Sequence, residues 1–453
     1  MSFSSLATLA DVIGSSLDYV PPSLHKNQVS NITTDTRDLS ENALFIALVG
    51  ERFDGHGFVE AAIAQGAIAA VVEEGKQIPH LPCLPVADTL VAYQALGHWW
   101  RTQQAARIVA ITGSVGKTTT KELIAAALGT QAPVHKTQAN YNNDIGVPKT
   151  LLQIQPDHAF GVVEMGMRGP GEIGRLARIA VPDVAVITNV GTAHIGRLGS
   201  EQAIADAKCE LLAALPAGAT AVINHDNPRL MATAAGVWSG RTLTFGLEGG
   251  DVRGEMVEAN TLVVEGVALP MPLPGRHNAL NLLAAIAVMQ AFDLDWRGLS
   301  QGLTVDLPGG RARQVSLPDD ILLLDETYNA GFESMVAALH LLAETPGQRH
   351  IAVLGTMKEL GERSLDLHHQ VGKTVSQLGL DALITLADPD EALALAEGAA
   401  GVKTIAFTDH ETLADHLRSI LQPGDRILLK ASRSVALDRV VNQLVETLSP
   451  PAD

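Results

Sequence analysis

The sequence contains little cysteine: its 453 residues include only Cys83 and Cys209. Two thiols without a C-x-x-C pair form no disulfide framework, which indicates a reducing compartment. No apolar run approaches the ~20 residues that cross a bilayer. The first residues also lack the basic segment and apolar core of a secretory signal. We therefore expect a cytoplasmic protein without a membrane span.

Positive charge is scarce as well. The chain has 32 Lys and Arg against 50 Asp and Glu, a formal net charge of −18, and no long basic cluster. This composition argues against a large basic face, so no nucleic-acid partner is expected. An anionic ligand would depend on a few local cations, backbone amides and metal. With 46% apolar residues, the chain is typical of a globular protein with about two to four domains.

Changes in the sequence pattern predict an α/β protein of three domains, at 1–86, 87–308 and 309–453. The first is a small α/β domain with an expected strand at 44–49. In the second, apolar runs alternate with helical segments such as 118–128, which favours a parallel sheet with helices on both faces. The third contains five further strand-like runs, enough for a second open α/β sheet.

The stretch "AITGSVGKTTTKE" is similar to a phosphate-binding loop of the form G-x-x-x-x-G-K-[ST]. Ile111 occupies the place of the first glycine, and the nearest glycine is Gly113. The loop can still bind phosphate without that glycine, because small residues connect a strand to the positive end of a helix dipole. Lys117 would neutralise phosphate oxygens and Thr118 would ligate Mg²⁺. A tight strand-to-helix turn with an exposed lysine is an equally weighted alternative.

Two residues at later strand ends raise the odds of a nucleotide site. Glu164 ends the apolar run "GVVE", and His194 follows "VAVITNVGTA". The carboxyl ends of parallel strands share one edge, where ligands bind, so Thr118, Glu164 and His194 are expected to converge. Their oxygens suit Mg²⁺, with an imidazole as an occasional ligand. The alternatives are a surface ion pair for Glu164 and, favoured for a lone histidine, a backbone-bonded turn for His194.

Sequence spacing alone does not assign a functional role to Lys208, Asn278 or Asn281. Lys208 lies in a helical pattern between Asp206 and Glu210, which by itself indicates a solvated face with weak charge pairs. Asn278 and Asn281 occupy neighbouring positions near a helix start. Their amides fit either the edge of a nucleobase or a helix cap.

Polar clusters follow three strands of the third expected domain, which suggests a second ligand-facing edge that closes over the first. Their members are Asp325, Glu326, Tyr328, Asn329, Lys358, Glu359, Glu362, Lys430, Ser432 and Arg433.

Together these stretches resemble the Mur ligase family of ATP-dependent amide ligases. "TGSVGKTT" fits the family loop T-G-[ST]-x-G-K-[TS], in which the absent first glycine is normal. "TTDTR", "LFIALVGERFDGHGF", "NYNNDIGVP", "DETYNAGFESM", "VLGTMKELGE" and "LLKASRS" are similar to further family segments. The resemblance covers nearly the whole chain. It implies a UDP-binding first domain, a P-loop ATPase-like central domain and a Rossmann-like last domain that closes over ATP and binds the incoming dipeptide.

The implied reaction joins D-alanyl-D-alanine to UDP-N-acetylmuramoyl-tripeptide through an acyl phosphate, with ATP as phosphoryl donor, in peptidoglycan precursor synthesis. Two Mg²⁺ ions and a lysine carbamate formed from CO₂ are implied as well, and a monomer is expected. Water would hydrolyse the intermediate, so the last domain should close first. We expect a hinge at 305–312. Whether the third residue of the tripeptide is diaminopimelate or lysine stays open.

The resemblance also implies roles for individual residues. Lys117, Lys208, His194 and Glu164 would be catalytic. The residues expected to border ATP are Gly113, Ser114, Val115, Gly116, Lys117, Thr118, Thr119, Asn278, Asn281, Arg311, Asp325 and Asn329. Thr118 and Glu164 would bind Mg²⁺, His194 would bind the second ion, and Lys208 would become a metal ligand on carbamylation. Thr36 and Arg37 would face the UDP end, and Asn140, Asn142 and Asn143 the sugar-peptide.

The chain departs from the family pattern at a few positions. Gly331 and Phe332 replace a usual Asn-Pro pair, Thr356 a usual Asp, and Ala431 a usual Gly. These changes affect expected substrate contacts more than the reaction. "DNPR", at 226–229, is similar to an amino-acid-selecting motif of a related ligase, but it lies in the middle domain, and we interpret it as an Asn-Pro turn.

Other functions remain open from the sequence. A related ligase could add a different amino acid, or a folate polyglutamylating enzyme could share the central motifs, although the UDP-like first domain fits the latter poorly. In a different class, a P-loop ATPase switch would hydrolyse ATP without acyl transfer. The polar clusters of the third domain argue against such a switch.

Overall fold

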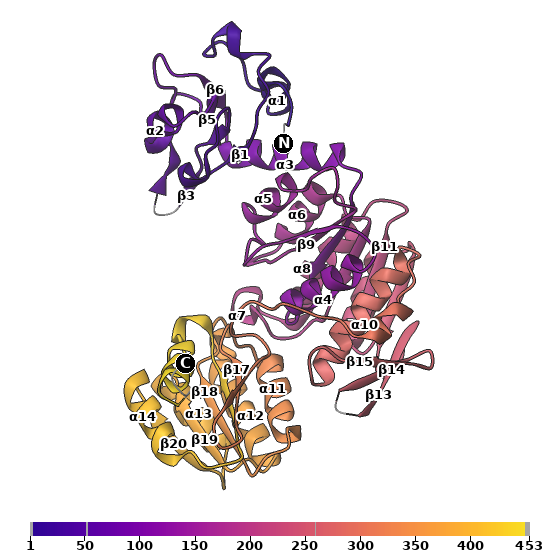
Figure 1. Ribbon diagram of the computed structural model, residues 1–453, viewed down its shortest axis with the longest axis vertical. Helices are drawn as coiled ribbons and strands as arrows, with labels where there is room; N and C mark the ends of the chain where they lie inside the picture. The colour runs from indigo at the N-terminus through magenta and orange to yellow at the C-terminus, as the bar shows by residue number, and fades with distance from the viewer. Residues whose placement is uncertain (1–2, 51–52, 259, 449–453) are drawn as a thin grey trace.

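The computed structural model describes residues 3–50, 53–258 and 260–448. Three α/β parts follow one another along the long axis of the molecule, with the first and last parts at opposite ends (Figure 1). Glu51 and Arg52, which belong to a stretch quoted above, lie outside the described residues. Every described helix is too short or too polar to cross a bilayer.

The first part contains a parallel sheet of strand order β1-β2-β5-β6 and a small β3/β4 hairpin. Its elements are α1 (Leu6–Val12), η1 (Pro22–Leu24), β1 (Ile32–Thr33), η2 (Thr36–Asp38), β2 (Leu44–Ile46), β3 (Val49–Gly50), β4 (Phe53–Asp54), η3 (Gly55–Phe58), α2 (Val59–Ala64), β5 (Ala69–Glu73) and β6 (Cys83–Val86). The single strand expected at 44–49 is wrong: β2 ends at Ile46. The carbonyl of Leu48 instead accepts the amide of Gly55 at 2.8 Å, which turns the chain into the hairpin.

Helix α3 (Thr89–Gln103) connects the first part to the central one. Its Tyr93 and Trp100 are buried in the apolar core of the first part, together with Leu152 from the central part. The indole nitrogen of Trp100 donates to the carbonyl of Ile154 at 2.9 Å. The two parts therefore share packing across the expected boundary at residue 86, and the boundary itself stays a prediction.

The central part has nine strands in the order β15-β14-β13-β12-β11-β10-β7-β9-β8, all parallel except for the antiparallel pairing of β14 with its two neighbours. Its strands are β7 (Arg107–Thr112), β8 (Val134–Lys136), β9 (Phe160–Glu164), β10 (Val184–Ile187), β11 (Thr220–Asn224), β12 (Thr242–Gly246), β13 (Val252–Glu258), β14 (Thr261–Val264) and β15 (Val267–Pro270). Its helices are α4 (Lys117–Gly129), α5 (Gly146–Leu152), α6 (Glu172–Ala180), α7 (Ile195–Leu198), α8 (Glu201–Ala213), α9 (Pro228–Val237), α10 (Arg276–Ala291) and η4 (Arg297–Gln301).

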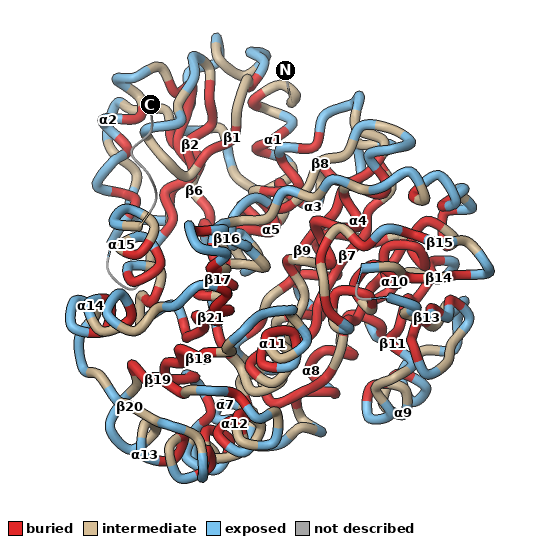
Figure 2. Tube along the Cα trace, turned by 60° about the horizontal axis from the view of Figure 1, so that its bottom comes forward, coloured by how far each residue is buried: buried red, intermediate tan, exposed pale blue. Residues whose placement is uncertain are grey.

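Alternate side chains of β7 enter two different cores of this part, as the pleat of a strand requires. Val109 and Ile111 pack with α4 and α10, whereas Ile108 and Ala110 pack with α5, α6 and α8. Strand β7 is thus covered on both faces, as the sequence predicted, and the buried strands lie inside an exposed outer layer (Figure 2). "DNPR" begins helix α9 rather than forming a simple turn: Asn227 accepts the amide of Leu230 at 3.0 Å.

The third part has the strand order β16-β17-β21-β18-β19-β20, with β16 antiparallel and the rest parallel. Its strands are β16 (Arg313–Leu317), β17 (Ile321–Glu326), β18 (Arg349–Gly355), β19 (Ala382–Leu386), β20 (Lys403–Phe407) and β21 (Asp425–Lys430). Its helices are α11 (Phe332–Glu344), η5 (Gly361–Arg363), α12 (Ser364–Gln377), α13 (Pro389–Gly398), α14 (His410–Ile420), η6 (Arg433–Val435) and α15 (Asp438–Leu448). The five expected runs became β17 to β21, and β16 was not foreseen.

The central and third parts meet where α7 lies against η5. Figure 1 shows α7 next to the third part. The amide of Gly196 donates to the carbonyl of Glu359 at 3.1 Å. A Cβ atom on Gly196 would lie 2.5 Å from the backbone nitrogen of Gly361, so the two backbones touch directly. The connecting segment 302–312 contains no helix or strand. The expected hinge lies in this segment, and its motion stays a prediction.

Candidate functional site

The loop between β7 and α4 needs glycine at two positions. A Cβ atom on Gly113 would lie 1.9 Å from the hydroxyl oxygen of Thr188. Gly116 has a φ of +81°, in the left-handed region, and a Cβ atom there would lie 2.9 Å from Oδ1 of Asn281. The glycines that identified the loop in the sequence are therefore required by close neighbours and by backbone conformation.

The segment after β10 holds this loop in place. Asn189 accepts the amide of Val115 at 3.0 Å, and Thr188 donates to the carbonyl of Val115 at 2.7 Å. The amide of Gly191 donates to the Ser114 hydroxyl at 2.9 Å. Helix α4 begins after Gly116 without a side-chain cap. Its first amides and its positive dipole end are therefore suited to an anion.

Lys117 curls over the loop. Its ammonium donates to the carbonyl of Gly113 at 2.7 Å and to that of Ser114 at 3.3 Å. Burial lowers the pKa of Lys117, and the nearby Glu164 carboxylate opposes this effect. The lysine and the carboxylate of the neighbouring strand end therefore face the same space.

Glu164 lies beside the loop because Ile111 of β7 pairs with it in register. Its Oε1 accepts the amide of the Asn142 side chain at 2.7 Å. Its Oε2 is buried and has no hydrogen-bond partner among the described residues. A buried carboxylate oxygen without a partner fits a cation. Thr118, 4% exposed on the first turn of α4, is the matching hydroxyl.

His194 follows β10 with a φ of +67° and precedes α7. Its Nδ1 lies 2.5 Å from Oε2 of Glu359, which makes the two an ion pair when the imidazole is protonated. Burial lowers the pKa of His194; Glu359 opposes the change, whereas Lys117 and Lys208 add to it. The backbone-bonded turn favoured for a lone histidine does not describe its ring.

Lys208 lies on α8 and is only 1% exposed. The solvated helix face that its spacing indicated is therefore wrong. Burial, reinforced by Lys117, lowers its pKa well below the ordinary value, and Cys209 and Glu333 act in the opposite direction. Within the described ranges, its ammonium has no hydrogen bond or ion pair.

Cations of the third part face the same region. The Arg311 guanidinium lies 3.8 Å from the centre of the Tyr328 ring. Lys430 donates to the carbonyl of Asn329 at 3.1 Å and lies 3.4 Å from Oε2 of Glu326. Burial lowers the pKa of Lys430, and Arg311 depresses the pKa of both Lys430 and Lys117. Arg311 is thus close enough to influence both ligand-facing edges.

The asparagines of α10 bond inside the protein. Asn281 accepts from the Thr120 hydroxyl at 3.0 Å and donates to Asn278 at 3.2 Å. Asn278 donates to the carbonyl of Pro274 at 2.8 Å. These bonds tie α10 to the phosphate-loop helix, which neither sequence alternative foresaw. A role in reading a nucleobase stays a prediction.

The candidate residues for the UDP end lie in the first part and are more exposed. Arg37 binds Asp35 through both nitrogen–oxygen pairs, and its side chain is 89% exposed. The bonds from Arg37 lower the pKa of Asp35 to about 2. Tyr141, which lies within the expected sugar-peptide loop between Asn140 and Asn142, contributes to raising the pKa of Arg37. Thr36 begins η2 next to this pair.

The residues expected to face the sugar-peptide differ in their hydrogen-bond partners and exposure. Asn142 binds Glu164, whereas Asn143 accepts the amide of Gly146 at 2.9 Å at the start of α5. Asn140 is exposed. The loop therefore extends from the buried Glu164 carboxylate towards Arg37 of the first part, whose pKa Tyr141 of this loop helps to raise.

The remaining sites lie in the third part. Asp325 accepts the Thr327 hydroxyl at 2.6 Å and lies 3.6 Å from Arg313. Thr356, one of the departures, accepts the amide of Asp388 at 2.8 Å. Ala431 is fully buried. Thr356 and Ala431 are thus accommodated within the fold.

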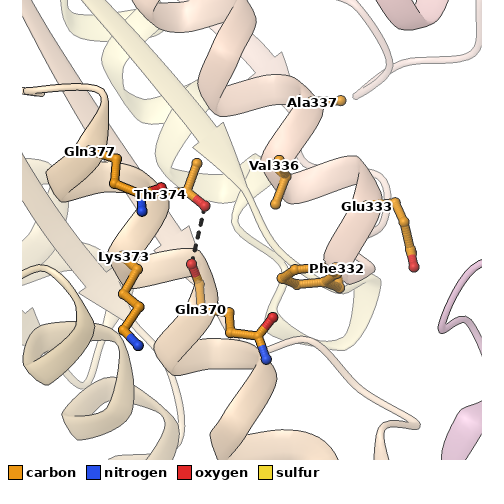
Figure 3. Close-up of a pocket in the computed structure, with 8 residues that line it drawn as sticks. All are labelled: Phe332, Glu333, Val336, Ala337, Gln370, Lys373, Thr374 and Gln377. Carbon is orange, nitrogen blue, oxygen red and sulfur yellow. Dashed lines mark hydrogen bonds between the residues drawn. The ribbon is translucent and has the colours of Figure 1, made fainter.

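Phe332, another departure, lines a groove of about 510 Å³ between α11 and α12. Figure 3 shows Phe332 and Val336 facing Gln370 and Thr374, while Glu333 points away from the groove. Apart from Glu333, the groove contains none of the charged residues described above. We assign no function to it.

Sequence reasoning overlooked Thr188, Asn189 and Glu333. The first two directly follow the apolar run of β10, the same strand-end signal that identified Glu164. Glu333 lies inside a quoted stretch without an assigned role. Its Oε1 accepts the amide of Thr192 at 2.6 Å, across the boundary between the central and third parts.

Comparisons with known proteins agree with this geometry. Family models match the Mur ligase family, catalytic domain, at residues 28–139, the Mur ligase middle domain at 111–289, and the Mur ligase, glutamate ligase domain, at 310–433. UDP-N-acetylmuramoyl-tripeptide–D-alanyl-D-alanine ligase from Synechocystis sp. is 55% identical over 92% of each chain, and that from Escherichia coli is 36% identical over 98% of each chain.

Solved structures give the same result. A crystal structure of MurF from Acinetobacter baumannii has a TM-score of 0.89 at 31% identity, covering 98% of this chain and 99% of that one. MurF ligase from Thermotoga maritima in complex with ADP has a TM-score of 0.82 at 30% identity, covering 92% and 97%. The chain belongs to the Mur ligase family.

Proposed function

We propose that this protein is an ATP-dependent UDP-N-acetylmuramoyl-tripeptide–D-alanyl-D-alanine ligase. The observation that carries the proposal is a loop that presents helix amides, with three cationic side chains around it, those of Lys117, Arg311 and the buried Lys430. Desolvated cations in this number favour a polyanion such as a nucleotide triphosphate. The relatives named above supply the choice of peptide substrate.

In the proposed reaction, the carboxylate of the tripeptide takes the γ-phosphoryl group of ATP, and the resulting acyl phosphate is a good acyl donor. The free amine of the dipeptide attacks this carbonyl, and phosphate leaves from the tetrahedral intermediate. Lys117 and the α4 amides stabilise charge that spreads over the phosphoryl oxygens. Arg311 is placed to contribute from the third part.

Magnesium fits the residues present. Among the described residues, no three His, Cys, Asp or Glu side chains gather into a preformed metal site. Magnesium commonly takes one or two protein oxygens and completes its shell with phosphates and water. Glu164 and Thr118 would supply those oxygens, and His194 would serve a second ion. Bound Mg²⁺ would neutralise phosphate charge and orient the reacting oxygens.

A carbamate on Lys208 also fits its surroundings. Only a neutral amine adds CO₂, and burial favours the neutral form of Lys208. Carbamylation of the neutral amine, with release of one proton, would place an anion beside Lys117 and so create an attractive pair. The product would resemble a carboxylate ligand in charge and donor atoms.

The decisive assay measures phosphate release by the purified protein with ATP, Mg²⁺ and UDP-N-acetylmuramoyl-tripeptide. We expect release to depend on D-alanyl-D-alanine and to match the formation of the pentapeptide product by mass spectrometry. Release with single amino acids only would instead identify a related ligase. Release without any acceptor would identify an ATPase switch.

We further propose that the enzyme acts as a monomer in the cytoplasm. Both cysteines are buried and unbridged, which suits a reducing compartment. Light scattering of the purified protein tests the monomer: a mass near 47.7 kDa supports it, and twice that mass contradicts it.

A further inference from the structure

A buried ion pair lies on α4, one turn beyond the phosphate loop. Lys121 is fully buried and Glu122 is 5% exposed. The Lys121 ammonium lies 2.9 Å from Oε1 of Glu122, and Lys136 pairs with the other oxygen of that carboxylate. A buried ion pair rarely stabilises a fold more than apolar residues of equal volume would. Its presence beside a catalytic loop therefore calls for another explanation.

The second contact of Lys121 leads to Glu164. Its ammonium donates to the carbonyl of Thr137 at 2.7 Å. The hydroxyl of Thr137, which is 1% exposed, accepts the backbone amide of Glu164 at 3.0 Å. The amide of Thr137 donates to the carbonyl of Val162 at 2.9 Å, so backbone and side chain of Thr137 are all engaged.

The same loop reaches the Glu164 carboxylate a second time. Five residues after Thr137, the side chain of Asn142 donates to Oε1 of Glu164 at 2.7 Å, and its carbonyl accepts the amide of Gly166 at 2.7 Å. One carboxylate oxygen is thereby occupied, and Oε2 is the oxygen without a partner. Lys121 anchors the beginning of the loop whose end orients this carboxylate.

We propose that Lys121 is a positioning residue for the magnesium-binding carboxylate: through Thr137 and the loop to Asn142, it fixes Glu164 so that Oε2 faces the metal. The inference rests on the proposed function. Because Lys121 and Thr118 belong to the same helix, the ammonium holds the two expected magnesium ligands in one geometry. Glu122 pairs with the buried ammonium and directs it towards Thr137.

The test compares Lys121→Met with Lys136→Met. Both variants remove a cation from the Glu122 carboxylate, but of the two ammonium groups only that of Lys121 hydrogen-bonds Thr137. Lys136 precedes Thr137 in the chain, and its side chain is 37% exposed. Binding of Mn²⁺ in the presence of ADP is measured by electron paramagnetic resonance, and binding of ADP without metal by calorimetry. Circular dichroism and thermal melts report folding.

We expect Lys121→Met to weaken Mn²⁺ binding about tenfold or more, as loss of an outer hydrogen-bond partner does at metal sites. Its metal-free ADP affinity should stay within about twofold of the wild type, because the loop amides are untouched. Lys136→Met should change neither quantity by more than about twofold. Unchanged Mn²⁺ affinity in Lys121→Met overturns the proposal, as does an equal loss of metal-free ADP binding.

A second variant keeps the test decisive if Lys121→Met does not fold. Thr137→Val removes the acceptor of the Glu164 amide at constant volume and leaves the ion pair intact. Weaker Mn²⁺ binding with normal ADP binding supports the relay, and normal Mn²⁺ binding overturns it. If the wild type itself binds no Mn²⁺ with ADP, the proposed function fails and not this inference alone.

Discussion

The candidate residues at the carboxyl edge of the central sheet differ in burial and bonding from the candidate UDP-binding residues of the first part. Around the phosphate loop, Glu164 and Lys208 are almost completely buried. In the first part, Arg37 is exposed and bonded to its sequence neighbour Asp35. The central edge is organised by long-range contacts within the protein, whereas Arg37 is placed to exchange Asp35 for another anion.

The difference teaches where a substitution should act. Preorganised polar groups stabilise charge in a transition state without reorganisation, so their loss reduces turnover. An exposed group that binds a remote portion of the substrate contributes mainly to its affinity. The following variants are expected to separate these two behaviours.

The largest effect is expected for Lys117→Ala. Removal of the cation that curls over the loop should lower turnover by about 10³-fold or more. The fold should persist, because within the described part of the chain the Lys117 ammonium bonds only carbonyls of its own loop. Coupled phosphate release measures turnover, and circular dichroism measures folding. More than about a tenth of wild-type activity would contradict the assigned role.

Lys208→Met should lose most activity and yet gain stability. At neutral pH, burial disfavours the ammonium form, so the apolar replacement should raise the free energy of unfolding by on the order of 1 kcal/mol. The unfolded chain binds the proton up to the ordinary lysine pKa of 10.5, while the folded chain releases it earlier. Stability of the wild type therefore rises with pH in that window.

The gain of Lys208→Met over the wild type should accordingly shrink as pH approaches 10.5. Urea unfolding at a series of pH values measures it. A gain that is constant with pH would show that packing, and not the charge, is responsible. Normal turnover in the variant would exclude the carbamate.

Gly196→Ala tests the contact between the central edge and the third part. Its Cβ would lie 2.5 Å from the backbone of Gly361, so the third part must shift. We expect about a tenfold fall in turnover, because misplacement of reacting groups by a fraction of an ångström is costly. Metal-free ADP binding should be unchanged. Gly129→Ala, where a Cβ would meet no neighbouring atom within 4 Å, is the matched control.

The smallest effect is expected for Arg37→Ala. The KM for UDP-N-acetylmuramoyl-tripeptide should rise about tenfold at constant kcat, because the group binds ground state and transition state alike. Stability should stay close to that of the wild type, since the Arg37–Asp35 pair is exposed. Arg418→Ala, which removes a comparable surface pair on α14, should leave KM unchanged. A fall in kcat would contradict the comparison, because it would mean that Arg37, like the residues of the central edge, acts on turnover.

Much of the site could be predicted from local sequence. The loop glycines follow from backbone conformation, and the position of Glu164 beside the loop follows from the rule that parallel strand ends share an edge. The burial of Lys208 could not be predicted from spacing, because charged residues flank it in its helix and such a pattern is typical of an exposed face. Contacts such as Thr120 with Asn281 join residues 161 positions apart, which no local pattern encodes.

Errors in the fold have similar causes. The 44–49 run is uniformly apolar, but the hydrogen bond from Gly55 to Leu48 ends the strand early. Strand β16 is largely exposed, so it lacks the apolar run by which the other strands were recognised. Both depend on tertiary partners, which override local propensity.

The packing of α3 has a practical consequence for work on isolated pieces. A fragment ending at Val86 would leave Tyr93 and Trp100 behind and open the apolar core that they complete. Such a fragment should aggregate, whereas one extended through Gln103 keeps the helix but bares the surface that meets Leu152 and Ile154. The first part is therefore best studied still attached to the central part.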